Sequence, residues 1–189
     1  MDEPADRLFT RIAPAVYDAA MTIKDFLAAQ LDREVARSRK ALEQMPEGQA
    51  DWKPHDRSMQ FGYLADMVAT IPTWIVFQLK QDSLDIAPAD GSKFPHTPKV
   101  TRADYLKALE DAAAQARQLF QETTEEKLAA PWQLKTRGNV VQEGPRHEMI
   151  QETISHWSHH RGQMTVYLRL MGAKVPALFG PSADENSFK

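Results

Sequence analysis

Apolar side chains recur every three or four residues along four long stretches of this chain, and no stretch alternates with the period of a strand. This spacing is typical of amphipathic helices that turn one face towards a core. The predicted helices cover roughly residues 22–45, 58–79, 101–120 and 146–171. They predict an all-α protein, and connections of roughly ten to twenty residues between them favour an up-and-down four-helix bundle.

Residues with particular backbone chemistry mark the ends of these helices. Ser58 and Thr101 are predicted N-caps, because a hydroxyl oxygen accepts a hydrogen bond from a free amide of the first turn. Gly172 is expected just after the last helix, where the backbone is often left-handed. Pro72 lies inside the second helix and cannot donate a backbone hydrogen bond, so we expect a bend near Val68.

One stretch breaks the helical pattern. Residues 129–145 contain two prolines and two glycines, together with Trp132, and are too irregular for a helix. A short hairpin is expected near Val140-Val141. A chain of 189 residues is long enough to bury a core without disulfides or metals. Residues 1–189 are therefore expected to form a single domain.

Composition narrows the class of protein further. A formal charge of -3 and the lack of a basic tract argue against nucleic acid or an anionic membrane as partner. The absence of cysteine excludes disulfides and thiolate ligands, and it suits a reducing compartment. No apolar run approaches the ~20 residues of a membrane span, and the acidic start lacks the pattern of a secretion signal. We therefore expect a cytoplasmic protein.

The candidate chemistry lies in the segment HWSHHRGQ of the last predicted helix. His156 and His160 are four residues apart and share one helix face. This face is polar in the middle and apolar at its ends, so both imidazoles are expected to point inward; its members are Met149, Thr153, His156, His160, Gln163, Tyr167 and Leu170. Two such imidazoles can bind one metal ion at about 2 Å from each nitrogen. A third ligand must come from elsewhere.

Three segments of the chain together resemble the DinB-like family of small four-helix proteins. They are DWKPH with the following SM and FGYLA at 51–65, HWSHHRGQMTVYLR at 156–169, and PALFGPSADE at 176–185. The resemblance covers most of the chain and implies an up-and-down bundle. In such proteins one histidine of the second helix and two of the last helix bind a divalent ion, usually zinc or nickel.

The resemblance also implies partners and reactions. Some relatives catalyse thiol-dependent transfers or isomerisation, as in the mycothiol-dependent maleylpyruvate isomerase and bacillithiol transferase types. A low-molecular-weight thiol is therefore a candidate cosubstrate for an unknown small molecule. Dimers are common in the family, so a homodimer is expected.

Position by position, His156 and His160 match the histidine pair of the last helix, whereas the second helix departs from the pattern. Where the family typically has Leu-Ala-x-His, this chain has Leu64-Ala65-Asp66-Met67. Met67 therefore stands in a ligand position. It shares its predicted inward face with Leu64, Ile71 and Trp74, so its thioether is expected to approach the histidine pair.

This departure leaves three outcomes open for the site. In the first, the metal site is lost and hydrogen bonds hold the two imidazoles. In the second, zinc or nickel binds to His156 and His160 with an oxygen ligand; Asp66 is nearest, although it lies about 100° around the helix from residue 67. In the third, Met67 is itself a ligand in a set suited to Cu(I).

Two functions of different classes follow. The first is a divalent-metal-dependent hydrolase or thiol transferase with an altered metal site. The alternative is a non-catalytic, metal-free bundle that acts as a binding or interaction module. The sequence does not decide whether the protein is an enzyme.

Other polar residues carry weaker signals. His159 is expected at the surface, His55 in a loop-packing or capping role, and Arg161 in solvent or in an ion pair. Glu148 and Glu152 lack the Glu-x-x-His spacing of a di-iron site.

Overall fold

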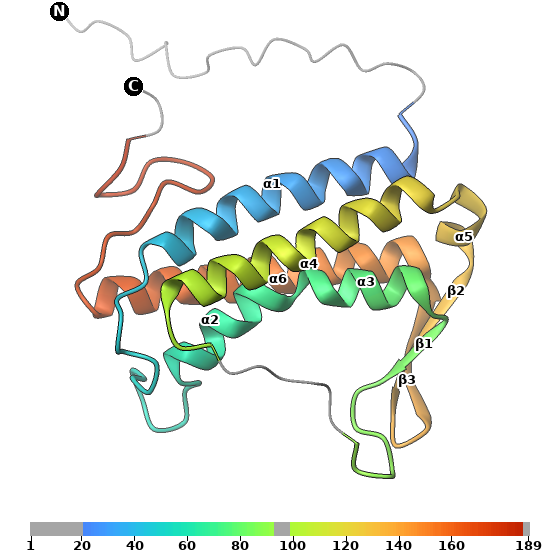
Figure 1. The fold of residues 1–189 in the computed structure, drawn as a ribbon, viewed down its shortest axis with the longest axis horizontal. Coiled ribbons are helices and arrows are strands. Elements are labelled where there is room, and N and C mark those ends of the chain that lie inside the picture. Colours follow the sequence, from blue (N-terminus) through green and yellow to red (C-terminus); the bar gives the residue numbers. More distant parts are fainter. Residues whose placement is uncertain (1–20, 93–98, 187–189) are drawn as a thin grey trace, which may run out of the picture.

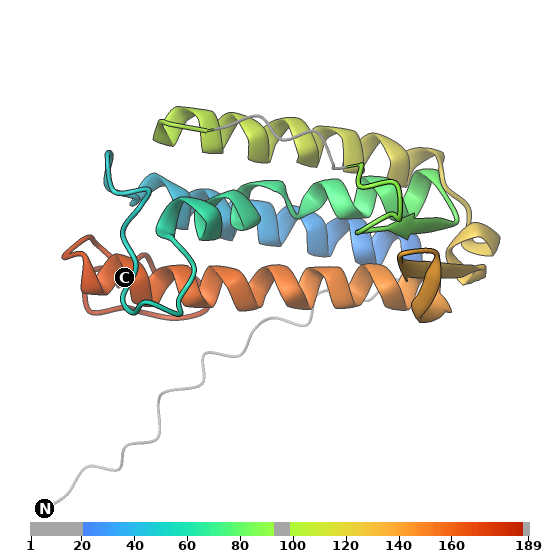
Figure 2. The same cartoon turned by 90° about the horizontal axis from the view of Figure 1, so that it is seen from below.

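A computed structural model of the chain describes residues 21–92 and 99–186. The long helices lie side by side, and the second of the predicted four is divided in two (Figures 1 and 2). The helices are α1 (Ile23–Glu43), α2 (Phe61–Thr70), α3 (Pro72–Lys80), α4 (Arg102–Glu122), α5 (Glu125–Ala129) and α6 (Arg146–Leu170). The strands are β1 (Ser83–Asp85), β2 (Pro131–Thr136) and β3 (Asn139–Pro145).

The apolar faces of the helices meet in one core. The apolar face of α1 and the residue Met45 after it are buried; the side chains are Leu27, Leu31, Val35, Leu42 and Met45. On the apolar face of α4, Leu119 is half-buried, and the buried side chains are Tyr105, Leu109, Ala112, Ala116 and Phe120. Burial of these side chains is the main favourable contribution to folding, at roughly 25 cal/mol for each Å² of apolar surface removed from water.

The helices do not alternate in direction, so the up-and-down prediction is wrong. The Tyr105 hydroxyl at the start of α4 donates to the Gly62 carbonyl at the start of α2, at 3.4 Å. These two neighbouring helices therefore run the same way. The Tyr167 hydroxyl near the end of α6 donates to the Met59 carbonyl just before α2, so α6 runs against α2. α3 ends beside the strands, whereas α4 begins at the opposite end of the bundle (Figure 1).

The purely α prediction is also wrong, because a small sheet closes one end of the helices (Figure 1). Its order is β1-β2-β3, with β1 parallel to β2 and β2 antiparallel to β3. The hairpin expected near Val140 is the β2–β3 hairpin. Its turn places Arg137 and Gly138 at φ 51° and 78°, as a two-residue hairpin turn of type I′ requires. β1 has only three residues, too few to produce a recognisable alternation.

The predicted helix ends are partly confirmed. Thr101 is the N-cap of α4 and forms a capping box with Asp104, while Gly172 follows α6 at φ 74°. The prediction for Ser58 is wrong, because α2 begins at Phe61. Two loop carbonyls replace the missing cap: Trp52 and Ala50 accept from the amides of Phe61 and Gly62, both at 2.8 Å.

The bend expected near Val68 is the break between α2 and α3 at Ile71. Beyond α6, the chain folds back onto α1 and α6. Arg37 of α1 donates to the Leu178 carbonyl, and Arg169 pairs with Asp184 through both guanidinium ends. Among the described residues, no helix is both long and apolar enough to cross a membrane.

Candidate functional site

The two histidines of α6 lie against each other. Their Nε2 atoms are 2.7 Å apart, and their ring centres are 4.4 Å apart. His160 is buried, as expected, but the inward prediction is wrong for His156, which is exposed. The core side of α6 is marked by Trp157. An α-helix turns by about 100° per residue. Around the axis of α6, His160 therefore lies about 60° from Trp157, and His156 lies about 100° from it. The pair therefore stands at the rim of the bundle.

Hydrogen bonding fixes which ring nitrogens carry protons. The Gln163 side-chain oxygen lies 2.9 Å from Nδ1 of His160, and an amide oxygen can only accept, so this Nδ1 carries the hydrogen. In the neutral ring, Nε2 of His160 is then an acceptor. If both rings are neutral, His156 donates to it from its own Nε2, and the two imidazoles form a hydrogen-bonded chain that ends on Gln163.

The surroundings favour the neutral form of His156. Its partial burial lowers the pKa of the imidazole, and the neighbouring His160 and His159 lower it further, since a second positive charge beside them is unfavourable. Neutral imidazole is the form that binds a metal ion. The geometry and the protonation state therefore both suit ligation.

Helix α2 contacts α6 next to the histidine pair. The Trp157 indole, one residue after His156, donates from Nε1 to the Val68 carbonyl at 2.7 Å. Met67 precedes Val68 directly and is half-buried. Asp66, the oxygen ligand weighed above, forms an ion pair with Lys99 at 2.5 Å. That carboxylate is already held by a cation.

The residues present fit part of a metal site. Two histidine nitrogens bound to one tetrahedral ion at 2.0–2.1 Å would stand about 3.3 Å apart, so a small rotation of the rings would admit an ion. His160 also donates its other ring nitrogen to a fixed acceptor, as metal-binding histidines commonly do. However, no three histidine, aspartate or glutamate residues gather into a metal-binding group within 21–92 and 99–186. The pair could thus supply two ligands, and the described residues offer no third ligand of these types.

The other candidates lie where the sequence predicted. His159 is exposed, and its ring centre is 5.3 Å from that of His160. Nδ1 of His55 accepts from the Arg57 amide, which is a local capping role. Glu152 is exposed and accepts from Gln142 of the hairpin.

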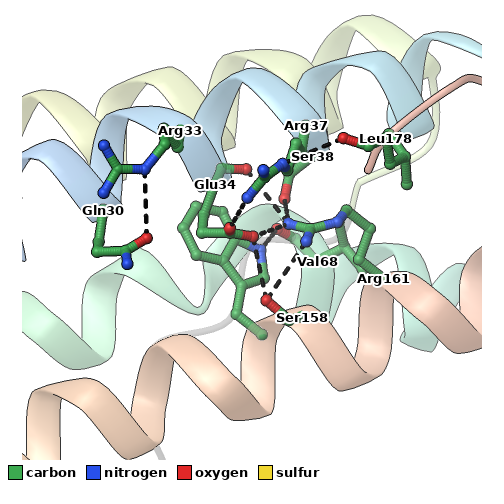
Figure 3. Close-up of polar contacts among 10 residues, drawn as sticks. Gln30, Arg33, Glu34, Arg37, Ser38, Val68, Ser158, Arg161 and Leu178 are labelled. Atoms are coloured by element: carbon green, nitrogen blue, oxygen red, sulfur yellow. Dashed lines mark hydrogen bonds and ion pairs between the residues drawn. The ribbon is translucent and has the colours of Figure 1, made fainter. Parts of the chain in front are cut away.

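Arg161, expected in solvent or in an ion pair, forms an ion pair beside the site, but neither its burial nor its partner Glu34 was predicted from the sequence. Nη1 of Arg161 lies 2.5 Å from Oε2 of Glu34, and the two side chains are almost fully buried, with exposures of 1% and 4%. Ser158 also donates to this carboxylate, and Arg37 pairs with it from α1 (Figure 3). The network ties α1 to α6. Its signal in the sequence is that Glu34 falls on the apolar face of α1, where a carboxylate needs a buried partner.

Comparison with known proteins gives a consistent picture. A sequence model of the DinB family matches residues 21–186. The chain is 42% identical over 53 residues to the uncharacterised protein YrdA of Bacillus subtilis, a match that spans 28% of this chain and only 32% of that relative.

Solved structures share the fold. A DinB-like protein of Bacillus subtilis, YjoA, superimposes with a TM-score of 0.60 at 17% identity, covering 81% of this chain and 96% of that one. A DinB-like protein of Bacillus cereus superimposes with a TM-score of 0.60 at 19% identity, covering 80% of this chain and 94% of that one. YfiT of Bacillus subtilis gives 0.55 at 16% identity, covering 80% and 89%, and is described as a probable metal-dependent hydrolase with an unusual four-helix bundle topology.

Proposed function

The chain belongs to the DinB family, and we propose that it is a metal-dependent hydrolase with a reduced metal site. In this proposal His156 and His160 hold a divalent ion, zinc or nickel, and Met67 stands in place of the third histidine. The observation that carries the proposal is the convergence of the two Nε2 atoms, 2.7 Å apart, with Gln163 fixing the second ring. The description of YfiT as a probable metal-dependent hydrolase adds support.

Each residue has a defined part in this proposal. Gln163 holds the His160 ring so that its Nε2 atom is directed at His156. The lowered pKa of His156 keeps that ring neutral near pH 7. Because His156 is exposed, substrate and water can reach the pair from solvent. When bound, the ion would lower the pKa of a water molecule or a thiol.

The same chemistry extends to the second activity, thiol transfer with a low-molecular-weight thiol as cosubstrate. Assays with and without added thiols on the metal-loaded protein distinguish the two. We also propose a cytoplasmic homodimer. Exposed apolar side chains on α2 and α6, namely Tyr63, Val166 and Leu170, support the dimer, and sedimentation equilibrium tests it.

One observation favours a metal-free alternative. The two imidazoles already satisfy each other by a hydrogen bond, and Met67 presents a thioether, a poor ligand for zinc. In that case the protein is a non-catalytic bundle that binds a small molecule or another protein.

Calorimetric titration with zinc and nickel separates these functions. The wild-type protein is expected to bind about one equivalent, and His156→Ala should weaken binding more than tenfold, since outer-shell changes alone already cost 10–100-fold. His159→Ala is the matched control, because it removes an exposed neighbouring imidazole. A wild-type protein that binds neither metal contradicts the proposal and supports the metal-free bundle.

A further inference from the structure

Pro72 leaves one backbone carbonyl of α2 without its helical donor. In a continuous helix the Val68 carbonyl would accept from the backbone amide of residue 72, but proline has no N–H. Val68 and Pro72 are both buried, so water is a poor substitute. An unpaired buried carbonyl is costly.

The donor that replaces this amide comes from another helix. Nε1 of Trp157 donates to the Val68 carbonyl at 2.7 Å, and the Trp157 side chain is fully buried. Figure 3 shows the Val68 contact beside the Glu34–Arg161 pair. A hydrogen bond that would normally lie within one helix therefore joins α2 to α6 instead.

This contact lies at the candidate site. Trp157 directly follows His156, and Val68 directly follows Met67. The hydrogen bond thus fixes the position of α2 along α6 and the separation of the two helices, next to residue 67 on α2 and His156 on α6. A shift of α2 along α6 would break the contact and move residue 67 away from both imidazoles.

We propose that Trp157 is the positioning residue of the metal site, and that Pro72 makes this possible by leaving the Val68 carbonyl free. The indole contact fixes α2 against α6 at the residues that directly follow Met67 and His156. This inference rests on the proposed function for its metal-binding consequence, while the contact itself can be tested without metal.

Trp132 provides a matched control for Trp157. Both indoles are almost fully buried, with 1% and 0% of their surface exposed, but Nε1 of Trp132 has no hydrogen-bond partner among the residues that the structure describes. Changing either residue to phenylalanine removes a similar amount of ring. Only Trp157→Phe removes a hydrogen bond, so the difference between the two variants isolates its effect.

The first experiment uses no metal. Trp157→Phe is expected to lower the melting temperature by about 4–10 °C more than Trp132→Phe does, because it leaves a buried carbonyl unpaired. Pro72→Ala supplies a backbone amide to Val68, so Trp157→Phe should cost much less in that background. If Trp157→Phe lowers the melting temperature equally with and without the Pro72→Ala change, the inference is overturned, whatever the protein's function.

The second experiment measures zinc affinity in a Met67→His background, where three histidines are available. Adding Trp157→Phe is expected to weaken zinc binding by roughly 10–100-fold, whereas Trp132→Phe changes it less than about twofold. Adding Pro72→Ala to the Trp157→Phe protein should restore the melting temperature but not the zinc affinity, because the hydrogen bond between α6 and α2 is still missing. Recovery of both would show that Trp157 is only a stabilising residue.

The two experiments distinguish a failure of the proposed metal function from a failure of the positioning role of Trp157. If Met67→His binds no zinc while the melting temperatures depend on Pro72 as expected, the contact is real and the proposed metal function is wrong. If Met67→His binds zinc tightly and Trp157→Phe leaves that affinity unchanged, the metal function stands and the positioning role is wrong.

Discussion

Among single residues, Met67 is the one that we expect to limit how strongly the proposed site binds metal. Met67→His would add a third imidazole at the level of the pair, and we expect zinc to bind more than roughly 100-fold tighter than to the wild-type protein, since loss of an outer-shell partner alone costs 10–100-fold. A competition titration against a chromophoric chelator measures this. Tyr63→His, one turn earlier on α2, is the control and should leave affinity unchanged. An equal gain from both variants would mean that residue 67 has no special position.

Glu34, which lies beside the candidate site, is expected to contribute strongly to the stability of the protein. Glu34→Ala leaves the Arg161 guanidinium buried without its carboxylate, and we expect a loss of about 3–5 kcal/mol in the free energy of unfolding. Asp32→Ala is the matched control, because Asp32 on the same helix pairs with Arg117 at the surface, where about 0–1 kcal/mol is typical. Urea denaturation measures both. Similar losses from the two variants would contradict the structural role assigned to the buried pair.

What could be predicted at this scale depended on spacing. The i, i+4 spacing placed His156 and His160 together, and the departure at Met67 was visible in the sequence. The sequence did not reveal that His156 lies at the rim, because a shared helix face extends over a wide arc of which only part faces the core. The Trp157–Val68 contact also escaped prediction, since it depends on how two helices are aligned along each other.

At the scale of elements, the capping box of α4 gives a pH-dependent contribution. Hydrogen bonds from the backbone of Thr101, then from that of Val100, hold the pKa of Asp104 below its usual 3.8. Because the folded-state pKa is the lower one, the carboxylate stabilises the protein above about pH 3.8, and this contribution is lost as the pH falls through the folded-state pKa. Asp104→Asn should therefore be less stable than wild type at pH 7.

The difference between wild type and Asp104→Asn should shrink steadily as the pH falls from about 4 towards 2. Thermal melts across this range measure it. A difference that stays constant with pH would mean that the amide replaces every interaction of the carboxylate and that its ionisation contributes nothing.

The long helices could be predicted from the sequence more clearly than the strands. Helices such as α1 and α4 are long and bury one apolar face, so many residues repeat the same signal. The sheet is built from short strands, and β1 pairs in parallel with β2 across a long stretch of chain. Such pairing leaves little local pattern. The prediction of an N-cap at Ser58 was wrong because the amides of the first turn of α2 donate instead to carbonyls of the preceding loop, those of Trp52 and Ala50.

Across the whole molecule, the positions of the long helices were predictable from the sequence, whereas their directions were not. Directions follow from where the connections lead, and a long connection permits either direction of the next helix. Here α2 and α4 run in parallel. This arrangement still leaves α2 beside α6, where Trp157 contacts Val68, the residue after Met67.

The proposed function depends on a divalent ion held by His156 and His160. Diffraction from a nickel-soaked crystal, collected at the nickel absorption edge, would locate this ion. We expect one anomalous peak per chain within bonding distance of both Nε2 atoms, which should move apart from 2.7 Å to about 3.3 Å. A map with no peak at the pair, and with the two imidazoles still hydrogen-bonded at saturating nickel, would contradict it.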